Sequence, residues 1–95
     1  MELSTNANIV TIRGNIKTIA DYRAIKEAVD KIVSGTKNVI LVIPDSISMT
    51  SSVIGYLNKL AQGDHVKVTL KIGNEELLEL LNELNLQSIF HIVKI

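Results

Sequence analysis

The sequence predicts an α/β fold with a mixed sheet of four to five strands and the element order β(β)αβαβαβ. Two observations lead to this prediction. Short runs of apolar, often β-branched residues recur along the chain, and segments with helical periodicity separate them. Strands that alternate with helices imply parallel pairing through right-handed crossovers. A short hairpin at the start would add one antiparallel strand and make the sheet mixed.

Length and composition predict a single domain over residues 1–95. A chain of 95 residues, 46% of them apolar, can bury one core without help from metals or disulfides. The sequence has no cysteine, which excludes disulfides and thiolate metal sites. Ten basic and ten acidic residues cancel, and no basic stripe stands out, which argues against nucleic-acid binding. The longest apolar run is too short to span a bilayer and the first residues do not resemble a secretory signal, so we expect a cytoplasmic protein without membrane insertion.

The first two predicted strands lie close together at the start of the chain. Glu2–Ser4 predicts a short strand that turns at Thr5–Asn6. Asn8–Arg13 predicts a second strand, which Gly14 would end.

The first predicted helix begins with a capping box, because the hydroxyl of Thr18 is followed three residues later by Asp21. Ser34–Gly35 would end this helix, since glycine is favoured just past a helix C-terminus. Its apolar stripe comprises Tyr22, Ile25, Ala28, Val29, Ile32 and Val33.

Val39–Ile43 is an uninterrupted apolar run, which is typical of a parallel strand buried on both faces. Pro44 and Asp45 would stop this strand, because proline cannot donate a ladder hydrogen bond. A polar connection, Ser46–Thr50, then leads into a helix that would run from Ser51 to Gly63. The apolar positions of that helix are Val53, Ile54, Leu57, Leu60 and Ala61.

The last third of the chain predicts a strand, a helix and a final strand. Val66–Ile72 alternates apolar and polar residues, as a strand with one dry face does. Gly73–Asn74 would form a turn and an N-cap before a leucine-rich third helix. The final strand would cover about Ile89–Val93.

Hydroxyl side chains gather at the predicted start of the second helix, beyond the carboxyl end of the middle strand. In open α/β sheets, ligands and modifications tend to occupy this end of the strands. Hydroxyls at a helix start also have an ordinary role, because serine and threonine are favoured N-caps. Thr50, Ser51 or Ser52 could each be that cap.

Over almost its whole length, from about Asn8 to Val93, the chain resembles the STAS family, which includes bacterial anti-sigma factor antagonists. The segment Thr50–Gly55, TSSVIG, occupies the place of the family motif D-S-[ST]-G-[LI]-G at a helix start. Asn15–Lys17 follows Gly14 as in the family's G-x-[LI]-D turn. The tail LNLQSIFHIV is similar to the closing pattern of the family.

The resemblance implies a non-catalytic protein that binds a partner which is both kinase and anti-sigma factor. The phosphorylated residue would be Ser51, with Ser52 as the alternative, and phosphorylation would release the partner. A phosphate adds about −1.5 to −2 charges to the interface. The unpaired N–H groups of a helix start tolerate such charge. The expected partner-binding residues are Lys17, Asp45, Thr50, Ser51, Ser52, Val53 and Ile54.

The chain differs from the family pattern at three positions of this site. Thr50 and Lys17 stand where the family has aspartates, and Val53 replaces the first glycine of the motif. These differences keep a second interpretation open. In it, the chain is a constitutive scaffold subunit of a transporter ATPase or a signalling complex, without phosphorylation.

An enzyme is the weakest interpretation, because no motif places a base against a nucleophile. His65 and His91 are far apart in sequence and have no neighbouring ligand, so no metal site is expected. The acidic residues of the third helix are most simply a solvated face. No phosphate-binding glycine loop is present and no cofactor is expected, so a partner would have to supply any nucleotide.

Overall fold

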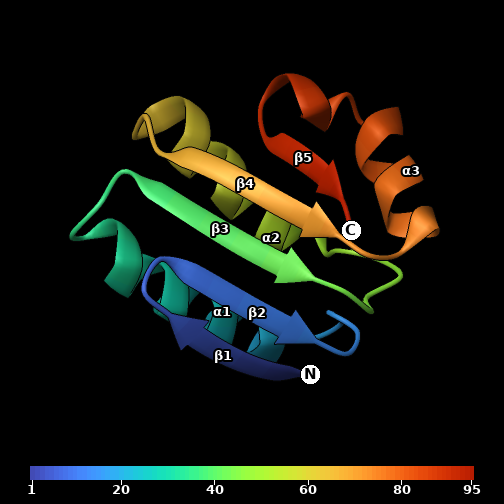
Figure 1. Cartoon of the computed structure of the whole chain (residues 1–95), viewed down its shortest axis with the longest axis horizontal. Coiled ribbons are helices and arrows are strands. Elements are labelled where there is room, and N and C mark those ends of the chain that lie inside the picture. Colours follow the sequence, from blue (N-terminus) through green and yellow to red (C-terminus); the bar gives the residue numbers. More distant parts are fainter.

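The computed structural model describes residues 1–95 and consists of one five-stranded mixed sheet with three α-helices (Figure 1). The strand order across the sheet is β1-β2-β3-β4-β5. In chain order the elements are β1 (Glu2–Asn6), β2 (Ile9–Arg13), α1 (Ile19–Val33), β3 (Asn38–Ile43), α2 (Ser51–Asn58), the π-helix η1 (Lys59–Gly63), β4 (Lys67–Ile72), α3 (Glu75–Glu83), the 3₁₀-helix η2 (Leu86–Ser88) and β5 (His91–Lys94).

β1 and β2 form the expected antiparallel hairpin, but the turn lies two residues later than predicted, at Ala7–Asn8. Asn6 pairs with Ile9, so β1 continues through residues that were expected to turn. A two-residue hairpin loop needs a positive φ, and Ala7 adopts one of 54°. Glycine or asparagine usually fills such a position, so nothing in the sequence marked Ala7 as the turn.

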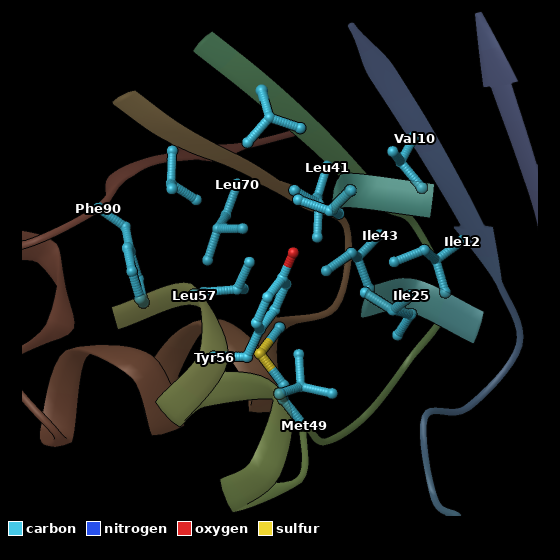
Figure 2. Packing of buried hydrophobic residues seen from close by; sticks show 14 of the residues in the cluster. Val10, Ile12, Ile25, Leu41, Ile43, Met49, Tyr56, Leu57, Leu70 and Phe90 are labelled. Atoms are coloured by element: carbon cyan, nitrogen blue, oxygen red, sulfur yellow. The ribbon is translucent and has the colours of Figure 1, made fainter. Parts of the chain in front are cut away.

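β2 to β5 pair in parallel, and each crossover moves one strand further in the same direction. Right-handed crossovers in one direction place every connecting helix on the same face of the sheet. α1 and α2 lie behind the sheet in Figure 1, and Leu77 and Leu81 of α3 join the same core cluster. The fold therefore has two layers, with the core between the helices and one face of the sheet (Figure 2).

The opposite face of the sheet carries no helix, and this corrects one prediction. Val39, Leu41 and Ile43 of β3 are fully buried, whereas Ile40 and Val42 are only half-buried. The expectation that this strand is covered on both faces is therefore wrong. A continuous apolar run does not distinguish a covered face from a half-covered one.

The helix boundaries follow the predicted capping signals. Thr18 and Asp21 form the complete capping box of α1, and Asn74 caps α3. The apolar segment after Ser51 continues past α2 as η1 and ends at Gly63, as expected.

The last strand starts two residues later than predicted. Phe90 N–H donates to the carbonyl of Leu86 at 2.8 Å, so Phe90 belongs to the turn of η2. β5 consequently begins at His91 and not at Ile89.

The end of β4 presses closely against the end of β3. Gly73 N–H donates to the carbonyl of Ile43 at 2.9 Å. A Cβ atom on Gly73 would lie 2.8 Å from Cα of Pro44, closer than real side chains approach. A glycine is therefore required here, and it fixes the start of the connection from β3 to α2.

Candidate functional site

The connections that follow β2 and β3 lie side by side at the carboxyl ends of the strands, and hydrogen bonds join them. Asp45 Oδ2 accepts from Gly14 N–H at 3.3 Å, and Asn15 Oδ1 accepts from Ile47 N–H at 3.0 Å. Gly14 has a φ of +85°, a conformation that favours glycine. The observed contact of Asp45 is thus with the neighbouring backbone, and the two connections form one surface.

Ser46 is the buried centre of this junction, and it was not singled out from the sequence. Its side chain is 0% exposed. The hydroxyl accepts from Ile16 N–H at 3.0 Å and donates to the carbonyl of Ser48 at 2.6 Å. A buried hydroxyl with both bonds made holds two loops in one arrangement, because losing it would leave a backbone group unpaired.

Thr50 is the N-cap of α2. Its side-chain oxygen accepts from Val53 N–H at 3.3 Å, and its carbonyl accepts from Ile54 N–H at 3.1 Å. Of the three hydroxyl residues that could cap the helix, the structure selects Thr50. The ordinary role of a hydroxyl at a helix start is therefore already filled by the residue before Ser51.

Ser51 and Ser52 are the first two residues of α2 and both are exposed. Neither hydroxyl makes a hydrogen bond, and neither backbone N–H has a partner. The first turn of α2 contains no acidic residue. The positive end of the helix dipole is thus uncompensated at Ser51, so an added anionic group would be stabilised there.

The other expected partner-binding residues differ in how exposed they are to solvent. Asp45 and Lys17 are exposed, and Thr50 and Ile54 are half-buried. The ammonium group of Lys17 makes no ion pair, while its backbone N–H donates to Asp21 at 2.9 Å. Lys17 therefore lies on the connection joined to that of Ser51, but no contact links the two side chains.

Val53 differs from the other expected binding residues because it is fully buried. Its side chain is 0% exposed and belongs to the core cluster. It lies on the buried side of α2 and is covered in the single chain. The valine that stands in the place of the first glycine of the STAS motif therefore packs in the core and does not cover Ser51.

Two exposed isoleucines border the junction and were not singled out from the sequence. Ile47 lies in the connection before α2 and is 51% exposed, and Ile19 begins α1 and is 69% exposed. They are two of the five large apolar side chains that the chain exposes, and both lie in or next to the joined connections. The sequence does not distinguish them from buried residues, because an isoleucine near the start of a helix is usually part of the core.

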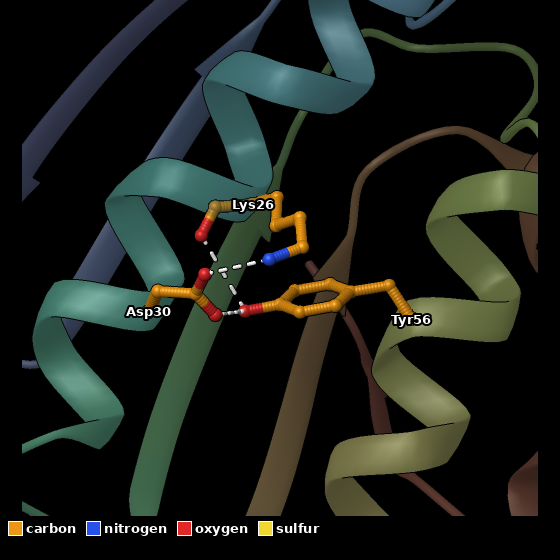
Figure 3. A network of polar contacts seen from close by, with 3 residues as sticks. All are labelled: Lys26, Asp30 and Tyr56. Atoms are coloured by element: carbon orange, nitrogen blue, oxygen red, sulfur yellow. Dashed lines mark hydrogen bonds and ion pairs between the residues drawn. The ribbon is translucent and has the colours of Figure 1, made fainter.

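A polar network fixes α2 against α1 behind this surface (Figure 3). The hydroxyl of Tyr56 donates to the carboxylate of Asp30, and Lys26 Nζ lies 2.8 Å from that carboxylate. Lys26 also lies over the Tyr56 ring, 5.4 Å from its centroid. Tyr22 meets the same ring edge-on at 6.4 Å between centroids. α2 is therefore held by a polar anchor one turn beyond its exposed serines.

The network shifts the pKa values of its members. Burial, and then the bond to Asp30, raises the pKa of Tyr56 above its ordinary value of 10.0. The bonds from Lys26 and Tyr56 lower the pKa of Asp30, and the bond to Asp30 raises the pKa of Lys26. Near neutral pH the tyrosine is thus a neutral donor to a charged carboxylate.

Other features of the chain lie outside this surface. The largest groove is formed by β1 and α1 and does not include the serines. No group of three or more potential metal ligands occurs, and His65 and His91 are both exposed. No helix is long and apolar enough to cross a membrane.

Comparisons with family models, with curated proteins and with solved structures find no match to this chain.

Proposed function

We propose that the chain is a non-catalytic, STAS-like protein-binding module of the anti-sigma factor antagonist type. In this proposal it binds a kinase-type regulator through the surface around Ser51, and phosphorylation of that serine ends the binding. Ser52 is the alternative acceptor. The family assignment rests on the resemblance of the sequence and on the element order, which agrees with that resemblance from β2 to β5.

The observation that carries this proposal is the state of Ser51. The residue is exposed and begins α2, and its hydroxyl and backbone N–H are both without partners. Thr50 performs the capping, so a substituent on Ser51 breaks no bond that holds the fold. A serine that is accessible and unused by its own structure is suited to modification.

The chemistry requires a partner that supplies the phosphoryl group. Ser51 Oγ would attack the terminal phosphorus of a nucleoside triphosphate held by the partner. The new P–O bond forms as the bond to the diphosphate breaks, and the hydroxyl proton passes to a base on the partner. Because the chain has no phosphate-binding glycine loop, its own part in the reaction is to present the acceptor.

The effect on binding follows from charge and position. The phosphate would be accommodated by the helix start, while an interface that formerly packed against a neutral hydroxyl would face about −1.5 to −2 charges. Ile47, in the connection before α2, is 51% exposed and would add apolar area to this interface, in which such a charge is costly.

A scaffold without phosphorylation is the second candidate function, and the residues around the acceptor favour it. Thr50 and Lys17 stand where the resemblance leads us to expect aspartates, which changes the charge that a kinase would meet. In this alternative the same surface binds a transporter ATPase or a signalling complex permanently.

The test compares immobilised wild-type protein with the variants Ser51→Ala and Ser51→Asp. Extracts of the native cells are passed over each, and retained proteins are quantified by mass spectrometry. We expect a protein that wild type and Ser51→Ala retain equally and that Ser51→Asp retains about tenfold less, because an unpaired charge buried in an interface costs more than about 1 kcal/mol.

Ser52→Asp is the matched control, since it adds the same charge one residue further along an exposed helix turn. A loss confined to Ser52→Asp would move the acceptor to Ser52. Equal retention by all variants would contradict the switch and favour the scaffold. Thermal melts of each variant establish that the fold is intact.

A further inference from the structure

β1 is an edge strand whose outer side is unprotected. Its sequence, ELSTN, contains no lysine or proline, the residues with which proteins usually block the edge of a sheet. The other edge strand, β5, carries Lys94, which reaches Glu75 of α3 at 3.8 Å. The two edges thus differ: β1 carries a charge only at its first residue, Glu2, and Leu3–Asn6 are uncharged.

The hydrogen-bond pattern identifies which groups of β1 point outward. Ile40 N–H donates to the carbonyl of Asn8 at 2.9 Å, so the backbone groups of even-numbered residues at the start of β2 face β3. Ile9 and Thr11 therefore face β1, where they pair with Asn6 and Ser4. The N–H and C=O groups of the alternate β1 residues must point away from the sheet. These residues are Leu3 and Thr5.

A groove lies along the same edge, between β1 and α1. Leu3 and Thr5 line its floor, and Ala24 and Ala28 of α1 line its wall. Its volume is about 380 Å³. The edge thus combines free backbone groups with an apolar recess for the side chains of an added strand, the combination used in β-strand addition.

We propose that a second copy of this chain occupies this edge, with the two β1 strands antiparallel about a two-fold axis at Ser4. In this register Leu3 pairs with Thr5 of the other copy, and Thr5 with Leu3. All four residues then use their outward N–H and C=O groups, and the two sheets join into one. The register is self-complementary, because the outward residues lie symmetrically on either side of Ser4.

The charges around the groove also suit a two-fold arrangement. Glu27 and Lys31 lie four residues apart on α1 and both line the groove. A two-fold axis perpendicular to β1 at Ser4 makes the two α1 helices antiparallel, so the order of Glu27 and Lys31 along one helix is reversed along the other. In the single chain these two side chains form a 3.6 Å ion pair with each other. Both are about three-quarters exposed, at 77% and 75%, so this weak pair can exchange for pairs across the axis. This complementarity favours a second copy over an unrelated strand.

The test uses charge at the proposed axis. Ser4 is exposed and would face its own copy as a closely spaced, non-hydrogen-bonded pair. Sedimentation velocity over a concentration series should show a dimer for the wild type. Ser4→Glu and Ser4→Lys should each be monomeric, because like charges would oppose each other directly. An equimolar mixture of the two variants should restore the dimer, which a folding defect could not do.

Gln87→Glu is the control for added charge, because Gln87 is exposed in η2, away from this edge. It should dimerise like the wild type. A wild type that stays monomeric at every concentration would overturn the proposal. So would a Ser4→Glu dimer of undiminished strength, or a mixture of the two Ser4 variants that stays monomeric. None of these results depends on Ser51 or on a kinase.

Discussion

At the scale of single residues, neighbouring hydroxyls at the start of α2 have different roles. Thr50 is half-buried and its hydroxyl is bonded to the helix that it caps, whereas Ser51 is exposed and its hydroxyl makes no hydrogen bond. This difference is the basis of the proposed switch. If Ser51 were the cap, adding a phosphate to it would disturb the helix as well as the interface.

The division of roles predicts different effects on stability. Thr50→Ala should lower the free energy of unfolding by about 1 kcal/mol, the usual cost of losing a threonine N-cap. Ser51→Ala should change it by less than about 0.5 kcal/mol, as exposed substitutions do. Urea denaturation of the two variants and the wild type measures both values. Equal costs, or a larger cost for Ser51→Ala, would show that the cap is assigned to the wrong residue.

At the scale of elements, the contact between α1 and α2 sets the position of the exposed serines. Val53 and Leu57 anchor α2 to the sheet, and Tyr56 anchors it to α1 through Asp30. The apolar contacts of α2 with the sheet stabilise its packing. The hydrogen bond and the ion pair of Asp30 fix its orientation against α1. α2 is therefore a rigid element on which a small change at its first residue can alter an interface.

This contact predicts a dependence of stability on alkaline pH. Because the pKa of Tyr56 is raised in the folded protein, the native state keeps this proton above pH 10, where the unfolded chain loses it. The stabilisation is complete below the unfolded value of 10.0 and is lost progressively as the pH rises above it. Urea unfolding from about pH 8 to about pH 11 should show this decline in the wild type.

Tyr56→Phe is the comparison for that experiment. It should lower stability near neutral pH by about 1–2 kcal/mol, through loss of the hydroxyl bond to Asp30. Its stability should then fall less than that of the wild type above pH 10.0, the ordinary pKa of the tyrosine that it lacks. Parallel pH profiles for the two proteins would contradict the role assigned to the buried hydroxyl.

At the scale of the whole molecule, most helices and strands could be predicted from local patterns. Which faces of the strands the helices cover could not be predicted in this way. The capping box at Thr18 and the cap at Asn74 gave two helix starts correctly, because capping depends on a few adjacent residues. Coverage of β3 depends on strand order, which a five-residue apolar run does not encode. The hairpin turn was misplaced because Ala7 adopts a conformation that alanine rarely takes.

The candidate site was only partly predictable for a similar reason. The position of Ser51 after the middle strand follows from the chain order. The buried bond of Ser46 to Ile16 joins residues thirty positions apart, and only the parallel pairing of β2 and β3 brings them together. Tyr56 and Asp30 likewise come from different helices. Tertiary contacts of this kind leave no local pattern in the sequence.

The measurement that tests the central claim most directly is phosphosite mapping of the protein from its native cells, with phosphatases inhibited during isolation. Intact-mass and peptide mass spectrometry should find two forms, one unmodified and one with a single phosphate on Ser51. The unmodified form should be enriched in the fraction bound to other proteins. A chain whose Ser51 is unmodified in both the bound and the free fractions would contradict the account.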